Sequence, residues 1–291
     1  MNIAFHLGAL CTDDERLHRA LLKDAEQLAL AGISVPWPSR YRRLLRETVG
    51  NLAGAAPSPD TREILLDAII EDHSAKRLVL SDPAFLSLPG YLFDAGRFYG
   101  HATARLHGLH SIFPEDRITL FLGLRNPATF VPAVWSQVRG RRFSGFMGEI
   151  DPRDLRWSDV IAQIRIAAPQ MALTVWCNED TPLIWTEVLR AIAGSGAEMA
   201  LAGEHDLLAA IMSPEGLVRF QKYLQTHPPQ TEAQTRRIIS AFLDKYALPE
   251  AIEEEVDLPG WDSALIEEMT ATYEDDVAMI AAQPGLTFIA P

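Results

Sequence analysis

Cysteine is scarce in this sequence, which contains only Cys11 and Cys177 among its 291 residues. The two lie far apart and form no Cys-x-x-Cys pair, so neither a disulfide framework nor a structural zinc site is indicated. The sequence also lacks a basic leader and any uninterrupted apolar run of membrane-spanning length. We therefore expect a cytoplasmic protein that is not attached to a membrane.

Positive charge is also in short supply, because the chain has a formal net charge of −13 at pH 7. Nucleic acids and anionic membranes bind positive surfaces, so neither partner is expected. Residues 251–291 contain ten Asp and Glu and no Lys or Arg. We interpret them as the solvent-exposed face of an amphipathic helix, with room for a basic partner. Residues 101–150 instead carry six Arg against three acids, an excess that could hold a small anionic ligand.

Four apolar segments have the pattern of buried strands, and each is followed by polar residues and a helical pattern. They are NIAFHLG at 2–8, RLVLSD at 77–82, RITLFLG at 117–123 and ALTVWC at 172–177. Strands separated by helices require crossover connections and a mostly parallel sheet. The predicted fold class is therefore α/β, a three-layer α/β/α sandwich with a mainly parallel central sheet.

Local signals place several helices around these strands. Helical patterns run over about 39–52, 60–71 and 94–110, Asn126-Pro127 opens another helix, and a further one begins at Pro182 and ends at Gly194. We treat residues 1–291 as one domain, with the sheet core in 1–200. Residues 201–291 are predicted to be a mainly helical extension that ends in the short strand LTFIA.

Three segments, in this order, resemble the P-loop sulfotransferases. The first is HLGALCTDDERL after the first strand, the second is LFLGLRNPATFVPAVWSQ after a central strand, and the third is the closing YEDDVAMIAAQPGLTFIAP. Together they span nearly the whole chain. The Arg-Asn-Pro motif carries specificity in its context, whereas the closing segment indicates the fold alone.

The resemblance implies a P-loop fold, a transfer reaction and its donor. In that family the loop after the first strand wraps the 5′-phosphosulfate of 3′-phosphoadenosine 5′-phosphosulfate, and an Arg with a downstream Ser holds the 3′-phosphate. The resemblance assigns the 5′ end to Gly8, Ala9 and Thr12, and the 3′-phosphate to Arg125 with Ser136. The acceptor would be a hydroxyl of a sugar or another small molecule.

The sequence departs from the family's pattern at both ends of this site. The basic position of the loop falls on Cys11, and the Gly-Thr-Thr that follows falls on Asp13, Asp14 and Glu15. In the second motif, Ala133 takes the place of the serine. The resemblance therefore leaves the binding of the donor open.

The altered loop has a physical consequence of its own. Phosphates bind at helix N-termini because the first backbone N–H groups have no partner within the helix. Thr12 and Glu15 have the spacing of a capping box, and Asp13 and Asp14 add favourable negative charge to the same turn. These acids, with no Lys to offset them, would repel the donor. The alternative to a transferase is thus a non-catalytic protein whose phosphate loop is blocked by Asp13, Asp14 and Glu15.

A transferase would also need a general base at the same edge of the sheet. The ends of the predicted strands offer His6, Asp82, Glu179 and Asp180, and the sequence distinguishes none of them. Glu179 and Asp180 could instead cap the helix that begins at Pro182.

Two other groups of residues are candidate sites. Arg139, Arg141 and Arg142 precede FSGF at 143–146, which predicts either a solvated loop or a mobile flap with aromatic contacts. His107 and His110 share one predicted helix face, but no acidic or Cys ligand accompanies them. No metal is expected.

Overall fold

In the part of the chain that the structure describes, the sheet has six strands in the order β2-β3-β1-β4-β5-β6, and neighbouring strands are parallel throughout. The computed structural model describes residues 1–196, 198–252, 256 and 258–291. The strands are β1 (Asn2–His6), β2 (Ile33–Ser34), β3 (Arg77–Ser81), β4 (Arg117–Leu124), β5 (Ala172–Cys177) and β6 (Thr287–Ile289). The prediction of an α/β protein with a mostly parallel sheet is confirmed.

β1 lies between β3 and β4 and is covered on both of its faces. Ala4 is in register with Val79 of β3 and with Thr119 of β4. Ile3 and Phe5 belong to one hydrophobic cluster and Ala4 to another, because successive side chains of a strand point to opposite faces of the sheet. The continuous apolar run in the sequence is thus the pattern of a parallel strand buried on both sides.

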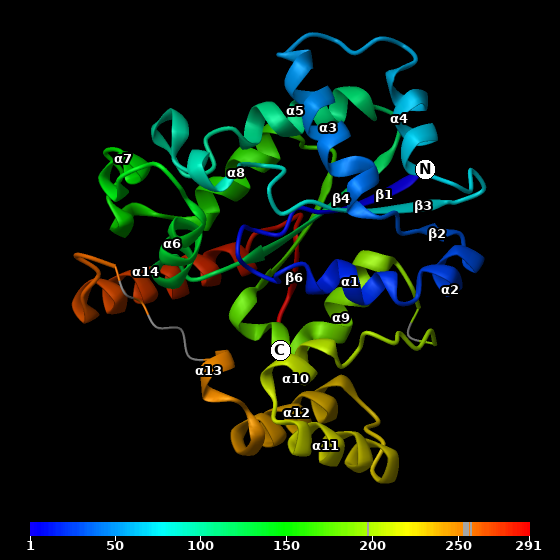
Figure 1. The fold of residues 1–291 in the computed structure, drawn as a ribbon, viewed down its shortest axis with the longest axis vertical. Coiled ribbons are helices and arrows are strands. Elements are labelled where there is room, and N and C mark those ends of the chain that lie inside the picture. Colours follow the sequence, from blue (N-terminus) through cyan, green and yellow to red (C-terminus); the bar gives the residue numbers. More distant parts are fainter. Residues whose placement is uncertain (197, 253–255, 257) are drawn as a thin grey trace.

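Helices on both faces of the sheet give the molecule three layers (Figure 1). The layer that packs on Ile3 and Phe5 contains α3 (Pro38–Leu52), α4 (Thr61–Ile69), α5 (Ala102–Ile112), α6 (Pro127–Gln137), α8 (Trp157–Ala167) and α14 (Ser263–Ala281). The layer that packs on Ala4 contains α1 (Arg16–Leu22), α2 (Ala25–Leu30), α9 (Thr181–Ala193) and α10 (Asp206–Ile211).

Several helix boundaries follow the local signals in the sequence. Asn126 caps α6, since its side chain accepts a hydrogen bond from the Ala128 N–H at 3.0 Å. α9 carries Pro182 in its first turn and ends at Gly194, which has a φ of 71°. Both predicted helices are confirmed.

The helix predicted over 94–110 begins later, at Ala102. Residues Asp94–Gly96 form a separate 3-10 turn. The chain cannot continue as one helix here because Ala95 and Tyr99 have left-handed φ angles of 62° and 53°.

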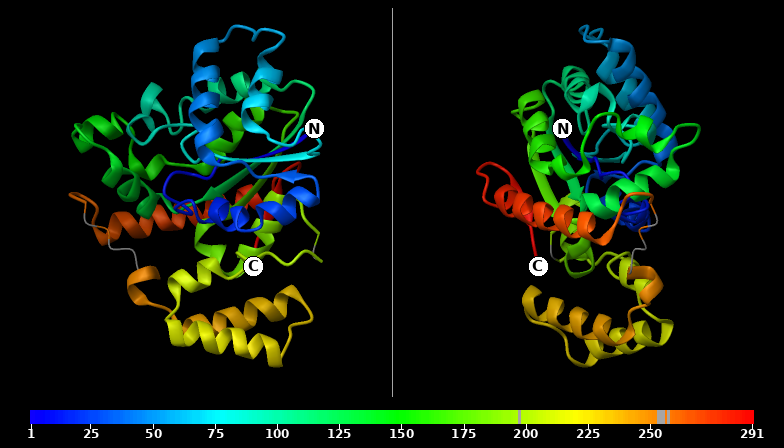
Figure 2. Two further views of the ribbon diagram at one scale, coloured as in Figure 1. Left: turned by 45° about the vertical axis from the view of Figure 1, so that its right-hand side comes forward. Right: turned by 90° about the vertical axis from the view of Figure 1, so that its left-hand side faces the viewer.

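The part of the chain beyond the sheet core leaves the body and then returns to it. α11 (Pro214–Thr226) and α12 (Glu232–Tyr246) lie side by side and protrude at one end, and α13 (Pro249–Ile252) follows (Figures 1 and 2). α14 packs against α6 and α8, and β6 joins the edge of the sheet beside β5. The predicted terminal strand is confirmed by β6, and the predicted amphipathic helix is confirmed by α14, in which Met269, Tyr273 and Ile280 are buried.

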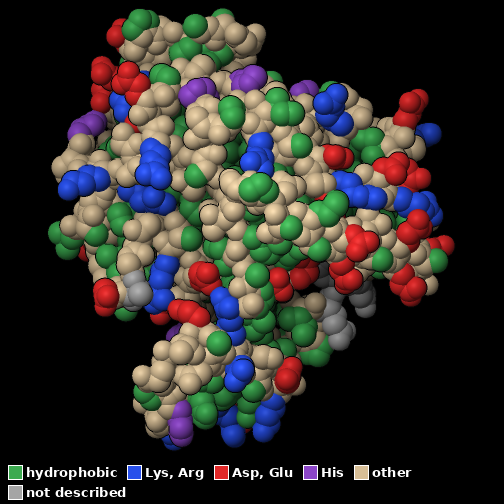
Figure 3. Space-filling view, turned by 180° about the vertical axis from the view of Figure 1, so that it is seen from behind, with side chains coloured by type: hydrophobic (Ala, Val, Ile, Leu, Met, Phe, Trp, Pro, Cys, Tyr) green, Lys and Arg blue, Asp and Glu red, His purple; other side chains and the backbone are tan. Residues whose placement is uncertain are grey.

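Charge is distributed unevenly over this shape. Seen from behind, Lys and Arg side chains gather at the lower end, over the α11–α12 hairpin, while Asp and Glu side chains gather on the side of the body where α14 lies (Figure 3). In the part of the chain that the structure describes, no helix is both long enough and apolar enough to cross a membrane.

Candidate functional site

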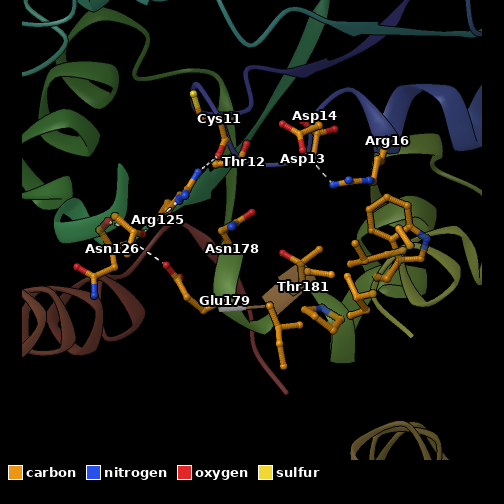
Figure 4. Close-up of a pocket in the computed structure, with 18 of the residues that line it drawn as sticks. Cys11, Thr12, Asp13, Asp14, Arg16, Arg125, Asn126, Asn178, Glu179 and Thr181 are labelled. Atoms are coloured by element: carbon orange, nitrogen blue, oxygen red, sulfur yellow. Dashed lines mark hydrogen bonds and ion pairs between the residues drawn. The ribbon is translucent and has the colours of Figure 1, made fainter. Parts of the chain in front are cut away.

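The carboxyl ends of β1 and β4 form the switch point of the sheet. After β1 the chain passes over β3 to reach β2, whereas after β4 it runs in the opposite direction to β5. Ligands of open α/β sheets bind in the crevice outside the strand ends at such a point. Two segments singled out in the sequence, the loop 7–15 and the residues from Arg125 onward, meet there (Figure 4).

The loop after β1, residues 7–15, is held in a wound conformation by its own hydrogen bonds. Gly8 has a φ of 63°, and a Cβ at this position would lie 3.1 Å from the Cβ of Pro83. The Thr12 hydroxyl donates to the Ala9 carbonyl at 2.8 Å and accepts from the Ala9 N–H at 3.3 Å. The Leu10 N–H donates to the Tyr99 hydroxyl at 3.2 Å. Tyr99, in the segment that precedes α5, therefore helps to hold the loop in this conformation.

Backbone strain accompanies this winding. Cys11, Asp14 and Glu15 have φ angles of 55°, 47° and 67°, in the left-handed region that residues other than glycine rarely adopt. Three such residues within one loop indicate that the surrounding structure fixes its shape, because each costs on the order of 1–3 kcal/mol.

The predicted capping box is wrong. α1 begins at Arg16, one turn after Thr12, and the Thr12 hydroxyl bonds to Ala9 instead of Glu15. Glu15 occupies the N-cap position in a left-handed conformation, without a side-chain capping bond. Asp13 takes over part of this role, since its Oδ2 accepts from the Leu17 N–H at 3.1 Å. The start of α1 is thus still occupied by a carboxylate of the protein.

Two of the loop acids, for which the sequence offered no Lys partner, are offset by arginines. Glu15 pairs with Arg42 at 2.5 Å, and Asp14 pairs with Arg16 at 3.2 Å on the surface. Burial pushes the pKa of Glu15 upward, but the hydrogen bond and charge of Arg42 outweigh burial and lower this pKa overall. Asp13, which is 7% exposed, is the acid whose carboxylate accepts a hydrogen bond from the first turn of α1.

Arg125 connects the end of β4 to the loop after β1. Its guanidinium donates to the Cys11 carbonyl and, at 3.3 Å, to the Thr129 hydroxyl. The Arg125 carbonyl accepts from the Trp157 indole at 2.8 Å. The side chain is only 8% exposed and still lines the cavity described below, pointing from β4 toward Cys11 and Thr12 (Figure 4).

Glu179, at the end of β5, is tied to the same region. Its carboxylate accepts from the Asn126 N–H at 2.7 Å and from the Tyr273 hydroxyl at 3.0 Å. The Asn126 side chain donates to Thr270 at 2.9 Å. Glu179 therefore joins β4, β5 and α14, a structural role that the sequence did not reveal.

The larger cavity at this edge of the sheet has a volume of about 720 Å³, within the range of small-molecule sites. Its polar lining includes Thr12, Asp13, Asp14, Arg16, Arg125, Asn126, Asn178, Glu179 and Thr181, and its apolar lining includes Pro182, Trp185, Leu207, Ala210, Ile211, Ala251 and Ile252. The cavity thus offers both hydrogen-bonding groups and an apolar surface to one ligand.

No family model, curated protein or solved structure matches this chain. What the site can bind therefore follows from its own geometry and chemistry.

A second cavity of about 440 Å³ lies on the other side of the same loop. Arg42 and Arg46, one turn apart on α3, line it together with Asp82 at the end of β3. Burial raises the pKa of Asp82 to about 6, although the charges of Arg46, 3.6 Å away, and of Arg42 pull it down. Sequence reasoning missed both arginines; their i, i+4 spacing on an amphipathic helix was the available signal.

The remaining candidate bases are placed less favourably. His6 is 1% exposed, its Nδ1 lies 2.9 Å from the Ser81 hydroxyl, and its ring stacks on Trp176. Burial lowers the pKa of His6, and the residue lines neither cavity. Asp180 is the N-cap residue of α9 without a side-chain capping bond, and partial burial raises its pKa. Asp82 is therefore the candidate best placed beside the loop.

Ser136 and the arginine cluster lie outside this arrangement. The Ser136 hydroxyl is exposed and donates to the Ala133 carbonyl at 2.7 Å, and the residue lines neither cavity. FSGF belongs to a short helix, α7 (Phe143–Met147), instead of a loop. Arg141 donates to the Gly90 carbonyl and lies over the Tyr91 ring at 5.4 Å. Within the described ranges, no group of three or more His, Cys, Asp or Glu residues could hold a metal ion.

Proposed function

We propose that this chain has a sulfotransferase-like fold and binds, in the larger cavity, a small molecule other than the phosphosulfate donor. One observation carries the proposal: the Asp13 carboxylate accepts the Leu17 N–H at the start of α1, where the donor's 5′ end would lie. A helix amide that already donates to a carboxylate is not available to a phosphate.

Electrostatics supports the same reading. Asp13 and Asp14 both line the larger cavity, and Arg16 offsets Asp14 only through a contact exposed to solvent, which is worth little. Two like unit charges about 4 Å apart repel by about 4 kcal/mol at an effective dielectric of about 20. An energy of this size corresponds to a loss of roughly several hundredfold in the affinity for a polyanionic donor.

A ligand that suits the cavity carries little negative charge. Hydrogen-bonding groups of the ligand would face Asn178 and Thr181, while an apolar part would lie against Trp185 and Leu207. This combination of a few polar contacts with an apolar surface is typical of small-molecule sites.

Titration calorimetry with adenosine 3′,5′-bisphosphate tests the proposal. We expect no measurable binding to the wild-type chain at millimolar ligand. Asp13→Gly combined with Asp14→Asn should bind measurably, because this variant frees the Leu17 N–H and removes both negative charges, while Asn tolerates the left-handed φ of residue 14.

The matched control is Glu63→Gln combined with Asp67→Asn, which changes the net charge equally on exposed positions of α4. This control should leave binding unmeasurable. Micromolar binding by the wild type, or no gain of the double variant over the control, would contradict the proposal.

Sulfuryl transfer is the second candidate, and Asp82 favours it. Its carboxyl lines the smaller cavity beside the loop, and its pKa of about 6 suits a general base. In this reaction Asp82 takes the proton of an acceptor hydroxyl as the acceptor oxygen bonds to sulfur. The bond from sulfur to the 5′-phosphate oxygen breaks, and adenosine 3′,5′-bisphosphate leaves.

The same titration separates the two candidates. A transferase requires micromolar binding of adenosine 3′,5′-bisphosphate that Arg125→Ala abolishes, followed by transfer of label from sulfur-labelled donor to a sugar or small-molecule hydroxyl. Asp82→Asn should then stop the transfer while leaving nucleotide binding intact.

A further inference from the structure

A groove between α11 and α12 lies apart from both cavities at the sheet edge. Its volume is about 560 Å³, and its lining comprises Arg219, Lys222, Tyr223, Thr226, Ala241, Phe242, Lys245 and Tyr246. Every charged residue in this lining is positive, although the chain as a whole has a net charge of −13. The groove thus combines an aromatic surface with basic side chains.

The groove is open to solvent. The hairpin protrudes from the body (Figures 1 and 2), and Tyr223 is 39% exposed. Arg219 pairs with Glu215 of its own helix at 2.7 Å, whereas Lys222 makes no ion pair with a residue that the structure describes. Lys245 lies 5.4 Å from the Tyr246 ring centroid. The groove therefore presents basic groups that another molecule can engage.

A surface of opposite charge lies on α14 of the same chain. Glu267, Ala271, Glu274 and Ala278 are exposed, and their spacing places them along one stripe of the helix. Asp275 and Met279 flank this stripe, and Met279 is 58% exposed. Within the described ranges, Glu267, Glu274 and Asp275 form no ion pair. The acidic stripe of α14, defined by these six residues, thus has no ion-pair partner among the residues of its own chain that the structure describes.

We propose that the α11–α12 groove of one copy binds the acidic stripe of α14 of a second copy. Charge complementarity selects the occupant, because a lone helix face with acidic residues and an exposed Met matches a basic groove with an aromatic lining. Ala271 and Ala278 permit close approach of the helix. Since the two surfaces are different parts of the chain, the contact is head-to-tail, and it can close into a ring or extend.

Sedimentation equilibrium of the full chain tests the proposal. At about 20 mM salt, where screening is weak, the weight-average mass should rise above 32.3 kDa as protein is increased from about 5 to about 200 µM. At about 500 mM salt the association should weaken at least tenfold, roughly as expected for exposed charge pairs.

Two charge-reversal variants supply the sharper test. Lys222→Glu with Lys245→Glu reverses two of the three basic groups that line the groove, and Glu274→Lys with Asp275→Lys reverses two of the three acids of the stripe. Each variant alone should stay at 32.3 kDa. An equimolar mixture should associate again, because each copy retains the surface that the other has lost.

Lys76→Glu is the control, since Lys76 is exposed and lies before β3, away from the hairpin; it should associate like the wild type. A wild type that remains at 32.3 kDa, a variant that associates like the wild type, or a mixture that stays monomeric would overturn the proposal. Binding of a synthetic acidic peptide by a chain that remains monomeric would overturn it too, by assigning the groove to another partner.

Discussion

Replacing Asp82 by Asn should change how the stability of this protein depends on pH. Asp82 is 2% exposed, and burial raises its pKa from an ordinary value of 3.8 to about 6. A shift of about two pKa units corresponds to about 3 kcal/mol. The folded state holds the carboxyl proton of Asp82 more tightly than the unfolded state does. The stability that this protonated carboxyl contributes is therefore fully present below the unfolded pKa and is lost as the pH rises through about 6.

Asn lacks this titration but keeps the shape of the side chain and an oxygen for the Ala84 N–H, which donates to Asp82 at 3.2 Å. Urea unfolding followed by tryptophan fluorescence, at several pH values between about 3.5 and 7, gives the free energy of unfolding of both proteins. As the pH rises across this range, the unfolding free energy of the variant should increase by about 3 kcal/mol relative to that of the wild type.

A difference between the two proteins that stays the same at every pH would refute the reasoning. Arg46→Gln is a companion variant in which the carboxyl remains. Removing the guanidinium 3.6 Å from Asp82 should raise the pKa of Asp82 further and move the loss of stability to higher pH, because a nearby positive charge favours the ionised form.

Three further substitutions test other parts of the structure. His18 is 1% exposed, and burial lowers its pKa to about 4, so the stability that the neutral imidazole contributes is present above the unfolded pKa of 6.5 and is lost as the pH falls through the folded value. As the pH falls from about 7 to 3.5, the unfolding free energy of His18→Gln should therefore increase by about 3 kcal/mol relative to the wild type, whereas that of Asp82→Asn increases as the pH rises. A difference that does not change with pH would contradict this prediction. Asp276→Ala removes the acceptor of the Trp157 and Ser158 N–H groups at the start of α8, 2.6 and 3.1 Å away, and should lower the unfolding free energy by about 2–4 kcal/mol. Asp276→Asn should retain most of the unfolding free energy, and equal losses in the two variants would argue against a capping role of Asp276 at α8. Gly8→Ala should cost about 1–3 kcal/mol and exceed Gly54→Ala, which also has a positive φ but no atom within 4 Å of its Cβ position; equal costs would exclude crowding by Pro83.

The order of the elements and many of their boundaries could be read from the sequence, because they depend on local patterns. The continuous apolar runs of β1, β3, β4 and β5 specify buried parallel strands. Asn126, Pro182 and Gly194 mark helix ends through their own backbone preferences. Placing the loop after β1 and Arg125 at one edge of the sheet also followed from the predicted parallel sheet, because the carboxyl ends of parallel strands meet at the same edge.

The sequence by itself therefore determined the fold class, the strand ends at which a site can form and the acidic character of the first loop. Only the tertiary structure decided which groups these acids contact. The Glu15 carboxylate pairs with Arg42, which is distant along the chain, and the Asp13 carboxylate accepts the hydrogen bond from the first turn of α1 instead. Packing likewise buried both His6 and Asp82, which each lie at the end of a strand, but it placed only Asp82 of the two in the lining of the smaller cavity. Contacts between segments remote in sequence depend on their positions in space, which no local pattern encodes.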